Sequence, residues 1–448
     1  MDFQKILKLY SDLGCERIYV KRLSPNDNSK NQVYLAGNFD VLNIFPIKEI
    51  YSDKTGKNQT EIFKAKIDYY WIDSDYGINS APFAQLILYP QYPEVRFSGF
   101  LKKAKNAPSE LMGNRIDGRI LFLGVNPEGK IIGYVTAPDS GLTEQFYNQK
   151  DLSDYGVFKV ITIKEGVVQI HEKEKLLIEL KRIHLLGWID SKRLDRDRNL
   201  IPCNSSNCGG YTLEAELGII PNGYAEPDFL GYEIKQYSVN DFKKIDSSIV
   251  TLMTPEPNGG IYVERGIESF IREYGYEDKM GRPSRLNFGG IHKFNQLTGS
   301  TGLKLIIEGY DKAEKLIKRT DGYIGLIDRN DKIAASWSFA ALLKHWNTKH
   351  ANACYVPSKI KNFNKEEIRF SNQQYHYGNE VMLGSGTDFS FVLEQISNGN
   401  LYYDPGIKLE LEIQGVRKQN IKRRSQFRMK SGNLTSLYKV SEIVNLLE

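Results

Sequence analysis

GYTLEAELG (residues 210–218) and PNGYAEPDFLGYEIKQY (residues 221–237) are the stretches of this chain that decide its fold and its chemistry. The first is typical of a short helix over residues 211–217, which would carry Glu214 and Glu216. The Pro, Asn and Gly residues that follow are turn formers. We therefore expect the helix to end there and a new element to begin near residue 228.

The second stretch predicts a β-hairpin. Asp228 opens it, Gly231 lies at or near its tip, and Glu233, Ile234 and Lys235 lie on the returning strand. Side chains alternate between the two faces of a strand. Glu233 and Lys235 should therefore point the same way and Ile234 into the core, and Asp228 can meet the pair across the hairpin.

Two carboxylates and a lysine that converge in this way can bind a metal ion and cut a phosphodiester. Asp228, Glu233 and the Ile234 carbonyl offer the oxygen ligands that Mg²⁺ takes beside its own waters, and a bound metal lowers the pKa of water. Lys235 would orient that water or stabilise charge on the phosphate. Glu214 is placed to touch a metal-bound water or Lys235. The pattern predicts a Mg²⁺-dependent nuclease with Asp228, Glu233, Lys235 and Glu214 as its catalytic residues.

The spacing Asp-x₄-Glu-x-Lys is common by itself, and in many chains such residues form an exposed ion pair on a strand. Three further features favour the nuclease. Pro227 directly precedes Asp228, the helix upstream is acidic, and the segment from Arg417 to Lys430 is basic without a single acidic residue. Such a segment can hold phosphates and aim guanidinium groups at guanine. A solvated basic hairpin is the alternative.

The expected DNA contacts fall into three groups. Two residues, Lys192 and Arg193, come shortly before the acidic helix and would clamp phosphate. Near the C-terminus the expected contacts are Arg417, Lys418, Lys422, Arg423, Arg424 and Arg428. In the N-terminal part they are Lys21, Arg22 and Arg96, for which ordinary surface charge is an equal alternative.

The overall composition fits a globular protein of two or three domains. Of 448 residues 41% are hydrophobic and 26% charged, and the formal charge of +5 is only a weak sign of nucleic-acid binding. The four cysteines are too few for a disulfide scaffold. Cys203 and Cys208 lie close in sequence, but further zinc ligands at the usual spacing are missing. We see no signal peptide and no membrane span, so a cytoplasmic protein is expected.

The sequence changes character near residue 170. The first dozen residues predict a helix, and short strands with turns between them follow from Arg17 to about residue 168. Residues 172–189 have Leu and Ile at helical spacing and predict one long amphipathic helix, with Leu186 on its apolar face. Beyond it helices and strands mix. We expect two domains, a mostly β barrel or sandwich over residues 1–170 and an α/β domain over residues 171–448.

Two further segments carry no sign of a site. SWSFAALL, residues 336–343, predicts the start of an apolar helix capped by Ser336. His345 and His350 follow it, but a spacing of five residues does not place two zinc ligands on one helix face. We expect both histidines to be core or surface residues.

At the residues quoted above, the C-terminal part resembles the MvaI/BcnI family of restriction endonucleases, which is related to the MutH nickase. The resemblance runs in order through LLGWIDSKR (185–193), GYTLEAELGI, AEPDFLGYEIK, SWSFAALL and LELEIQGVRKQNIKRRSQFRM (409–429). It implies a PD-(D/E)xK fold of the MutH-like type, with Asp228, Glu233 and Lys235 matching the catalytic set and Glu214 a nearby acidic position. It also implies a Mg²⁺-dependent monomer that cuts double-stranded DNA at a short site of the CC-N-GG kind. A cognate DNA methyltransferase would act on the same site without binding this protein.

The N-terminal part resembles the effector-binding domain of EcoRII, a B3-like DNA-binding barrel. The similar segments are IYVKRLSPND (18–27) and YPEVRFSGF (92–100). UbaLAI is similar in joining a B3-like domain to an MvaI-like one. The resemblance implies that residues 1–170 bind a second DNA site.

Three functions therefore stay open. The first is a two-domain type II restriction endonuclease, and the second is a MutH-like nicking or repair endonuclease. The third is a catalytically inert protein that binds DNA by sequence or methylation. An intact set of Asp228, Glu233 and Lys235 favours the first two, because an inert protein has no chemical need for all three.

Overall fold

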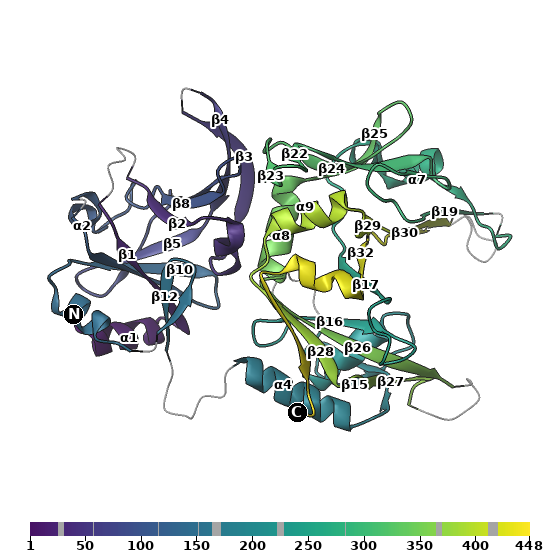
Figure 1. Ribbon diagram of the computed structural model, residues 1–448, viewed down its shortest axis with the longest axis horizontal. Coiled ribbons are helices and arrows are strands. Elements are labelled where there is room, and N and C mark those ends of the chain that lie inside the picture. Colours follow the sequence, from purple (N-terminus) through teal and green to yellow (C-terminus); the bar gives the residue numbers. More distant parts are fainter. Residues whose placement is uncertain are drawn as a thin grey trace. The chain divides into compact units, whose positions relative to one another are not determined.

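The computed structural model describes residues 1–25, 31–56, 58–114, 116–150, 152–163, 172–221, 228–282, 284–363, 370–410 and 420–448. The chain divides into two compact units, Met1–Gln169 and Ile170–Glu448 (Figure 1). This division falls next to the boundary expected at residue 170. Among the described residues, no helix has the length and apolar character needed to span a bilayer.

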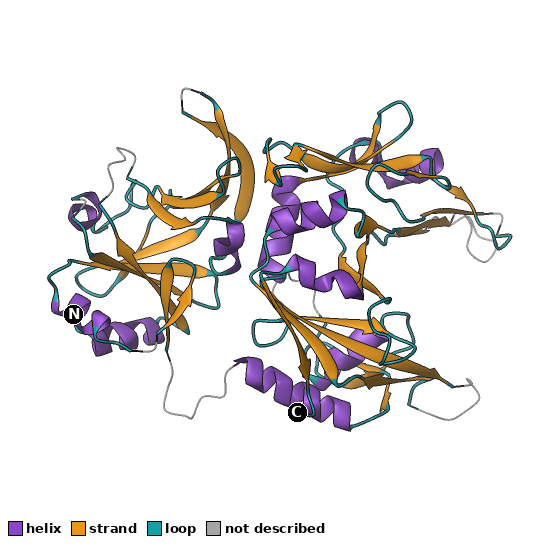
Figure 2. Ribbon diagram, in the orientation of Figure 1, coloured by secondary structure: helices purple, strands orange, loops and turns teal. Residues whose placement is uncertain are grey.

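The first unit is built mainly from strands (Figure 2). Its elements are α1 (Phe3–Asp12), β1 (Arg17–Leu23), β2 (Val33–Ala36), η1 (Phe39–Asn43), β3 (Glu49–Thr55), β4 (Thr60–Lys66), β5 (Asp68–Ile72), β6 (Ile78–Ser80), β7 (Gln85–Tyr89), β8 (Glu94–Ser98), α2 (Ser109–Gly113), β9 (Arg119–Val125), β10 (Lys130–Thr136), α3 (Gly141–Tyr147), β11 (Ser153–Tyr155) and β12 (Phe158–Thr162). The mostly β character is as expected.

These strands form two sheets rather than a closed barrel. One has the order β11-β12-β1-β9-β10-β5-β6 and the other the order β2-β8-β7-β4-β3. The paired strands are antiparallel except β10 and β5, which run parallel. Within the described residues neither sheet closes on itself, so the B3-like barrel stays a prediction.

The amphipathic first helix packs on the seven-stranded sheet as its pattern predicts. Phe3, Ile6 and Tyr10 of α1 are buried together with Phe122 of β9. The Tyr10 hydroxyl lies 3.1 Å from the Phe122 carbonyl oxygen. Gly124 leaves room for this ring, because a Cβ there would come within 2.4 Å of it. The close approach fixes α1 over β9.

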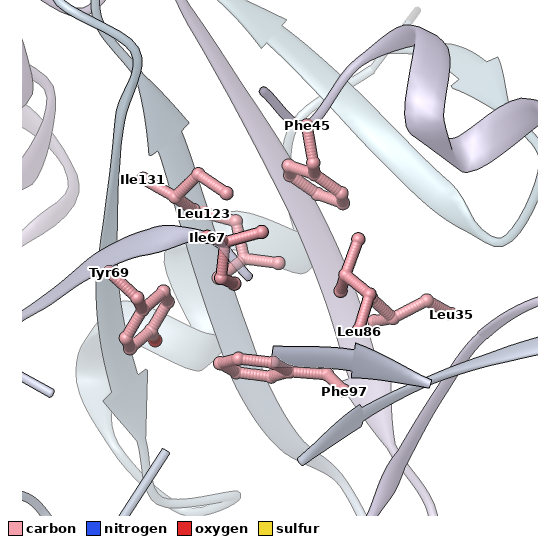
Figure 3. A pocket seen from close by; sticks show the side chains of 8 residues that line it. All are labelled: Leu35, Phe45, Ile67, Tyr69, Leu86, Phe97, Leu123 and Ile131. Carbon is pink, nitrogen blue, oxygen red and sulfur yellow. The ribbon is translucent and has the colours of Figure 1, made fainter. Parts of the chain in front are cut away.

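Both sheets of the first unit contribute to one core. A small apolar cavity in it is lined by Leu35, Phe45, Ile67, Tyr69, Leu86, Phe97, Leu123 and Ile131 (Figure 3). Leu86 and Phe97 come from the five-stranded sheet, and Tyr69 and Leu123 come from the seven-stranded sheet. The core therefore ties the two sheets into a single unit.

The second unit mixes helices and strands. Its helices are α4 (Glu172–Leu185), α5 (Cys208–Glu216), α6 (Ile261–Glu264), α7 (Gly266–Tyr274), α8 (Phe339–Lys349), α9 (Phe389–Ser397) and η2 (Ser431–Leu437). Its strands are β13 (Ile189–Asp190), β14 (Lys192–Leu194), β15 (Leu200–Pro202), β16 (Glu233–Ser238), β17 (Ile249–Met253), β18 (Tyr276–Glu277), β19 (Arg285–Gly289), β20 (Leu297–Thr298), β21 (Leu303–Glu308), β22 (Tyr310–Asp311), β23 (Leu316–Ile317), β24 (Tyr323–Ile327), β25 (Ile333–Ser338), β26 (Asn352–Asn362), β27 (Gln373–Tyr377), β28 (Glu380–Ser385), β29 (Leu401–Tyr403), β30 (Gly406–Glu410), β31 (Asn420–Lys422), β32 (Phe427–Lys430) and β33 (Val440–Asn445).

A six-stranded sheet holds the stretch that decides the fold. Its strand β16 pairs in parallel with β26, from Glu233 opposite Ala353 to Ser238 opposite Ser358. β26 also pairs with β27 and β28, which pair in turn with β13 and β33. Ile234 points into the core, where it joins buried residues of α4 and α5. We call this sheet, with α4, α5 and the two-stranded sheet β14-β15 that contacts α5, the first lobe.

Three further sheets of the second unit make up what we call the second lobe. Their orders are β17-β32-β29, β18-β19-β30-β31 and β20-β21-β24-β25. Helix α8 follows β25 of the second lobe and leads to β26 of the first lobe. It is therefore one of the segments that connect the two lobes.

Two local predictions were wrong. The helix from Glu172 ends at Leu185 instead of continuing to residue 189, since Gly187 takes a φ of +69° that ends the helix. Leu186 is consequently 51% exposed and off the apolar face. The cap of α8 is Ser338, whose hydroxyl accepts from the Ala341 amide at 3.4 Å, because β25 continues through Ser336 to Ser338 and the helix begins only at Phe339.

Candidate active site

The hairpin expected around Gly231 is present. Phe229 and Tyr232 exchange backbone hydrogen bonds of 3.0 and 2.8 Å. Leu230 and Gly231 have φ values of +48° and +77°. Positive φ at both central residues is typical of a type I′ turn, whose twist matches that of paired strands. Because β16 starts directly after this turn, the turn decides which side chains of β16 lie beside Asp228.

The carboxylate of Asp228 is held by the strand that it faces. Its Oδ2 accepts a hydrogen bond of 2.9 Å from the Ile234 amide. This contact joins the entry of the hairpin to β16. It places one carboxylate oxygen against the backbone between Glu233 and Lys235.

Glu233 is a buried carboxylate whose neighbours are lysines. Its side chain is 1% exposed, and its Oε1 lies 2.5 Å from Lys235 Nζ and 3.4 Å from Lys349 Nζ. Neither carboxylate oxygen receives a hydrogen bond of good geometry from the described residues. Burial raises the pKa of Glu233, and the two lysines act against that rise. The ion pairs are therefore what offsets the burial of this carboxylate.

Glu214 joins the same site from α5. Its pKa is raised to about 7, mainly by burial and also by the negative charge of Asp228, against the lowering effect of Lys235. Glu233 and Lys349 also act on it electrostatically. Three acidic and two basic side chains therefore lie close enough to share one electrostatic environment.

Close packing holds α5 against β16. A Cβ on Gly209 would lie 2.7 Å from the Gln236 side chain, so this position of α5 requires a glycine or a shift of Gln236. The Tyr377 hydroxyl donates to the Gly209 carbonyl at 2.7 Å. The Lys192 amide donates to Thr212 Oγ1 at 3.1 Å. These contacts fix the helix that carries Glu214.

The donors of this site fit Mg²⁺. Both oxygens of Glu233 are buried, and among the described residues neither has a hydrogen bond of good geometry, while Asp228 and the Ile234 carbonyl lie on the same hairpin. No group of three or more His, Cys, Asp or Glu side chains in the described residues could hold a metal ion alone. Mg²⁺ does not need one, because it takes one or two carboxylates and keeps several waters.

The two basic residues expected next to the acidic helix differ in their surroundings. Lys192 Nζ lies 2.5 Å from Glu216 Oε1, and both side chains are mostly buried. Its charge is therefore already matched within the first lobe. Arg193, on the same short strand, is exposed.

The basic segment near the C-terminus is partly open to solvent. Lys422, Arg423 and Arg424 are exposed at β31 and just after it. Arg428 is instead hydrogen-bonded to Asp404 at 2.7 Å and to Thr251 at 3.1 Å. These bonds tie β32 to its surroundings within the second lobe. Arg417 and Lys418 lie outside the described residues.

More cations gather on the same sheet of the second lobe. Lys408 of β30 is the residue opposite Lys422 of β31. Burial lowers the pKa of Lys408, and the charges of Arg285, Lys422, Arg424 and Arg282 lower it further. The basic surface is therefore broader than the run seen in the sequence.

The basic residues expected in the first unit are mostly paired. Arg22 lies 2.6 Å from Asp117, and Arg96 lies 2.7 Å from Glu94. Lys21 lies over the ring of Tyr34 at 5.7 Å. A neighbouring pair, Lys102 and Lys103, lies over the ring of the exposed Phe83 at 4.8 and 5.5 Å.

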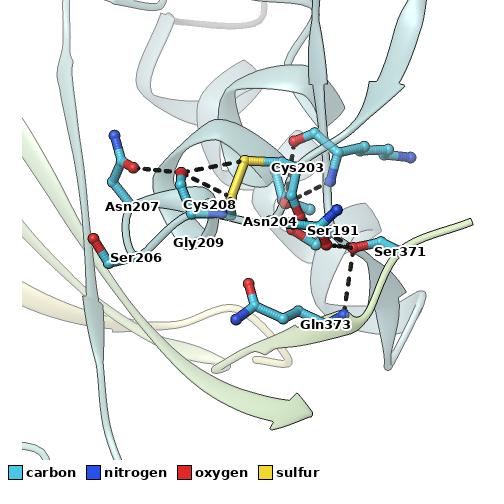
Figure 4. Close-up of a disulfide and its surroundings, with 12 residues drawn as sticks. Ser191, Cys203, Asn204, Ser206, Asn207, Cys208, Gly209, Ser371 and Gln373 are labelled. Atoms are coloured by element: carbon cyan, nitrogen blue, oxygen red, sulfur yellow. Dashed lines mark hydrogen bonds between the residues drawn. A yellow bond between two sulfur atoms is a disulfide. The ribbon is translucent and has the colours of Figure 1, made fainter. Parts of the chain in front are cut away.

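Two features of the site were not predicted. Lys349 reaches Glu233 from α8, 116 positions along the chain, and no local pattern marks it. Cys203 and Cys208 form a disulfide, which their short spacing allowed but which we did not expect (Figure 4). The pair is thus not a zinc site.

The disulfide fixes the start of α5. Cys208 is the first residue of that helix, and the Ser205 amide lies 2.9 Å from its sulfur. The Cys203 carbonyl accepts from Ser191 at 2.8 Å and from Ser371 at 3.1 Å. Ser206, in the loop that the disulfide closes, accepts from Arg424 Nη2 at 3.3 Å. The loop therefore touches both the helix of Glu214 and the exposed basic segment.

Comparison with known proteins places this chain among the restriction endonucleases, enzymes that cut DNA. It belongs to the MvaI/BcnI restriction endonuclease family, whose model matches residues 177–438. The match covers the candidate site and leaves out the whole first unit. The MvaI/BcnI resemblance seen in the sequence is confirmed, whereas the B3-like resemblance is not.

Two solved structures of restriction endonuclease MvaI are similar to this chain. The complex with cognate DNA substrate has 19% sequence identity and a TM-score of 0.45. The structure without DNA has 18% identity and a TM-score of 0.33. Each alignment covers 62% of this chain and 100% of the MvaI chain. No curated protein matches the chain. The assignment rests on the family match.

Proposed function

We propose that this restriction endonuclease hydrolyses double-stranded DNA with Mg²⁺ held by Asp228, Glu233 and the Ile234 carbonyl. The observation that carries the proposal is the convergence of Glu214, Asp228, Glu233 and Lys235 at one hairpin, inside the region that matches the family. Mg²⁺ bound there would supply positive charge to the phosphodiester and acidify a water.

The residues around the metal have separate tasks in this proposal. Lys235 orients the attacking water or stabilises the charge that develops on the phosphate. Glu214, with its pKa raised to about 7, can hold a proton or accept one near neutral pH. Asp228 is kept in place by its bond to the Ile234 amide.

The second lobe supplies the DNA-reading surface in this proposal. Lys422, Arg423 and Arg424 are exposed, and Lys422 lies opposite Lys408, which suits contacts to phosphates and to guanine edges. We propose a short recognition site of the CC-N-GG kind, cut by a monomer in the cytoplasm. A cognate methyltransferase would protect the same site without binding this enzyme.

The first unit is proposed to bind a second copy of the site. The support is a small number of lysines that lie over aromatic rings. Lys102 and Lys103 lie over the exposed ring of Phe83, and Lys21 lies over Tyr34. Cations beside aromatic rings at a surface are suited to nucleic acid. Arg22 and Arg96 would have to leave their carboxylate partners to take part.

A plasmid digest with and without Mg²⁺, followed by sequencing of the ends, tests the proposal. We expect discrete double-strand ends at one short CC-N-GG-like motif, and only with the metal. Nicks in one strand would instead favour a MutH-like enzyme. An intact plasmid, at any metal concentration and with folded protein, would favour an inert DNA-binding protein.

A further inference from the structure

A lysine from outside the predicted motif contacts the most buried acidic group of the site. Lys349 Nζ lies 3.4 Å from Glu233 Oε1, the same oxygen that Lys235 approaches at 2.5 Å. The Lys349 side chain is 23% exposed, and that of Glu233 is 1% exposed. Exposed ion pairs contribute little to stability because solvent and salt screen their charges. An ion pair with a buried carboxylate is screened much less and is therefore stronger.

The position of Lys349 is set by a well-anchored helix. At the start of α8, Asn258 Nδ2 donates to Ser338 Oγ at 2.8 Å, and the Ser338 amide donates to Asn258 Oδ1 at 2.9 Å. Near its end the fully buried Trp346 donates to Thr387 Oγ1 at 2.7 Å and stacks on His350. Lys349 is therefore held beside Glu233 by a helix that is anchored at both ends and follows a strand of the second lobe.

The charges of the site are nearly balanced before any metal arrives. Two ammonium groups, Lys235 and Lys349, face the carboxylates of Asp228 and Glu233 and lie near Glu214. A divalent cation that enters alone meets two positive charges next to its ligands. A DNA phosphate in the site would add negative charge and shift the balance towards the metal.

We propose that Lys349 is a positioning residue that holds Glu233 in the metal-free enzyme and makes metal binding weak until DNA is present. Lys235 remains the catalytic lysine, and Lys349 acts only through Glu233. The inference rests on the proposed metal site. It adds a regulatory role for α8, one of the helices that connect the two lobes.

Calcium binding to the DNA-free protein, measured by calorimetry, tests this role without relying on cleavage. In Lys349→Met we expect Ca²⁺ to bind three- to tenfold more tightly than in the wild type, because one repelling charge is gone. Lys349→Arg keeps the charge and should bind as the wild type does. Lys344→Met removes the same charge from an exposed position on α8 and serves as the matched control.

Two further measurements keep the outcomes distinct. Asp228→Ala should weaken Ca²⁺ binding; if it does not, the proposed metal site itself is wrong. If Asp228→Ala weakens binding while folded Lys349→Met binds Ca²⁺ equally or less tightly, only the role of Lys349 is wrong. Thermal unfolding shows whether Lys349→Met is folded. If it is not, Lys349→Gln takes its place and is likewise expected to bind Ca²⁺ more tightly than the wild type.

Discussion

At the scale of single residues, the protonation of Glu214 links the site to pH. Its folded-state pKa of about 7 lies above the ordinary value of 4.5. The folded metal-free protein therefore holds this proton more tightly than the unfolded chain does. The resulting stability is fully present below pH 4.5 and is lost as the pH rises through 7.

We expect the free energy of unfolding without metal to fall between pH 5 and pH 7 by up to about 1 kcal/mol per pH unit from this group. Urea unfolding in the presence of a chelator measures it. Glu214→Gln should flatten the dependence, although Glu233, whose pKa is also raised, retains part of it. Equal slopes in the two proteins would show that Glu214 does not titrate in this window.

The residues of one hairpin were predictable, and their distant partner was not. Alternation on a strand is enough to bring Glu233 and Lys235 to one face, and the turn at Gly231 brings Asp228 beside them. The contact of Lys349 with Glu233 depends on where α8 ends relative to β16. That relation is set by tertiary packing, which a local pattern does not contain.

At the scale of elements, the disulfide is expected to stabilise the start of α5. Closing a loop of this size lowers the entropy of the unfolded chain and contributes about 2 kcal/mol in the loop-entropy model. Replacing Cys203 and Cys208 by serine should lower the free energy of unfolding by about that amount. Denaturant unfolding with and without reductant provides the check. Reductant should have the same effect on the wild type and no effect on the variant. If reductant leaves the free energy of unfolding of the wild type unchanged, the disulfide does not form.

The basic segment is expected to separate into two roles. Arg423→Ala with Arg424→Ala should weaken DNA binding and lower the slope of log affinity against log salt by about 2, because two phosphate contacts are lost. Arg428→Ala should instead destabilise the fold, since Asp404 would lose its partner. Binding titrations across salt concentrations measure the slope. An unchanged slope in the double variant would make Arg423 and Arg424 ordinary surface residues.

Helix limits show where element prediction fails. The apolar spacing correctly placed a helix from residue 172, but it did not show that Gly187 would end the helix before Trp188. In SWSFAALL both serines suit a cap, and because β25 stays paired with β24 through Ser338, the helix begins only at Phe339 and Ser338 becomes its cap. The choice is made by a neighbouring strand and not by the helix sequence.

At the scale of the whole molecule, the division near residue 170 predicts two units that fold separately. Each has its own core, and the family match starts at residue 177. We expect a protein without residues 1–170 to fold and to cut DNA, with a changed dependence on the number of sites per plasmid. Cleavage of one-site and two-site plasmids measures this. An insoluble fragment would mean that the units share a core, and an unchanged site dependence would remove the second-site role of the first unit.

We propose that Asp228 and Lys235 carry out the cleavage chemistry and contribute little to DNA affinity. The most direct test compares single-turnover cleavage and DNA affinity for the wild type, Asp228→Ala and Lys235→Ala at saturating Mg²⁺. We predict that both variants lose cleavage by at least about a thousandfold. Their DNA affinity, measured with Ca²⁺, should stay within severalfold of the wild type. Variants that still cut while binding DNA poorly would contradict the assignment of the site.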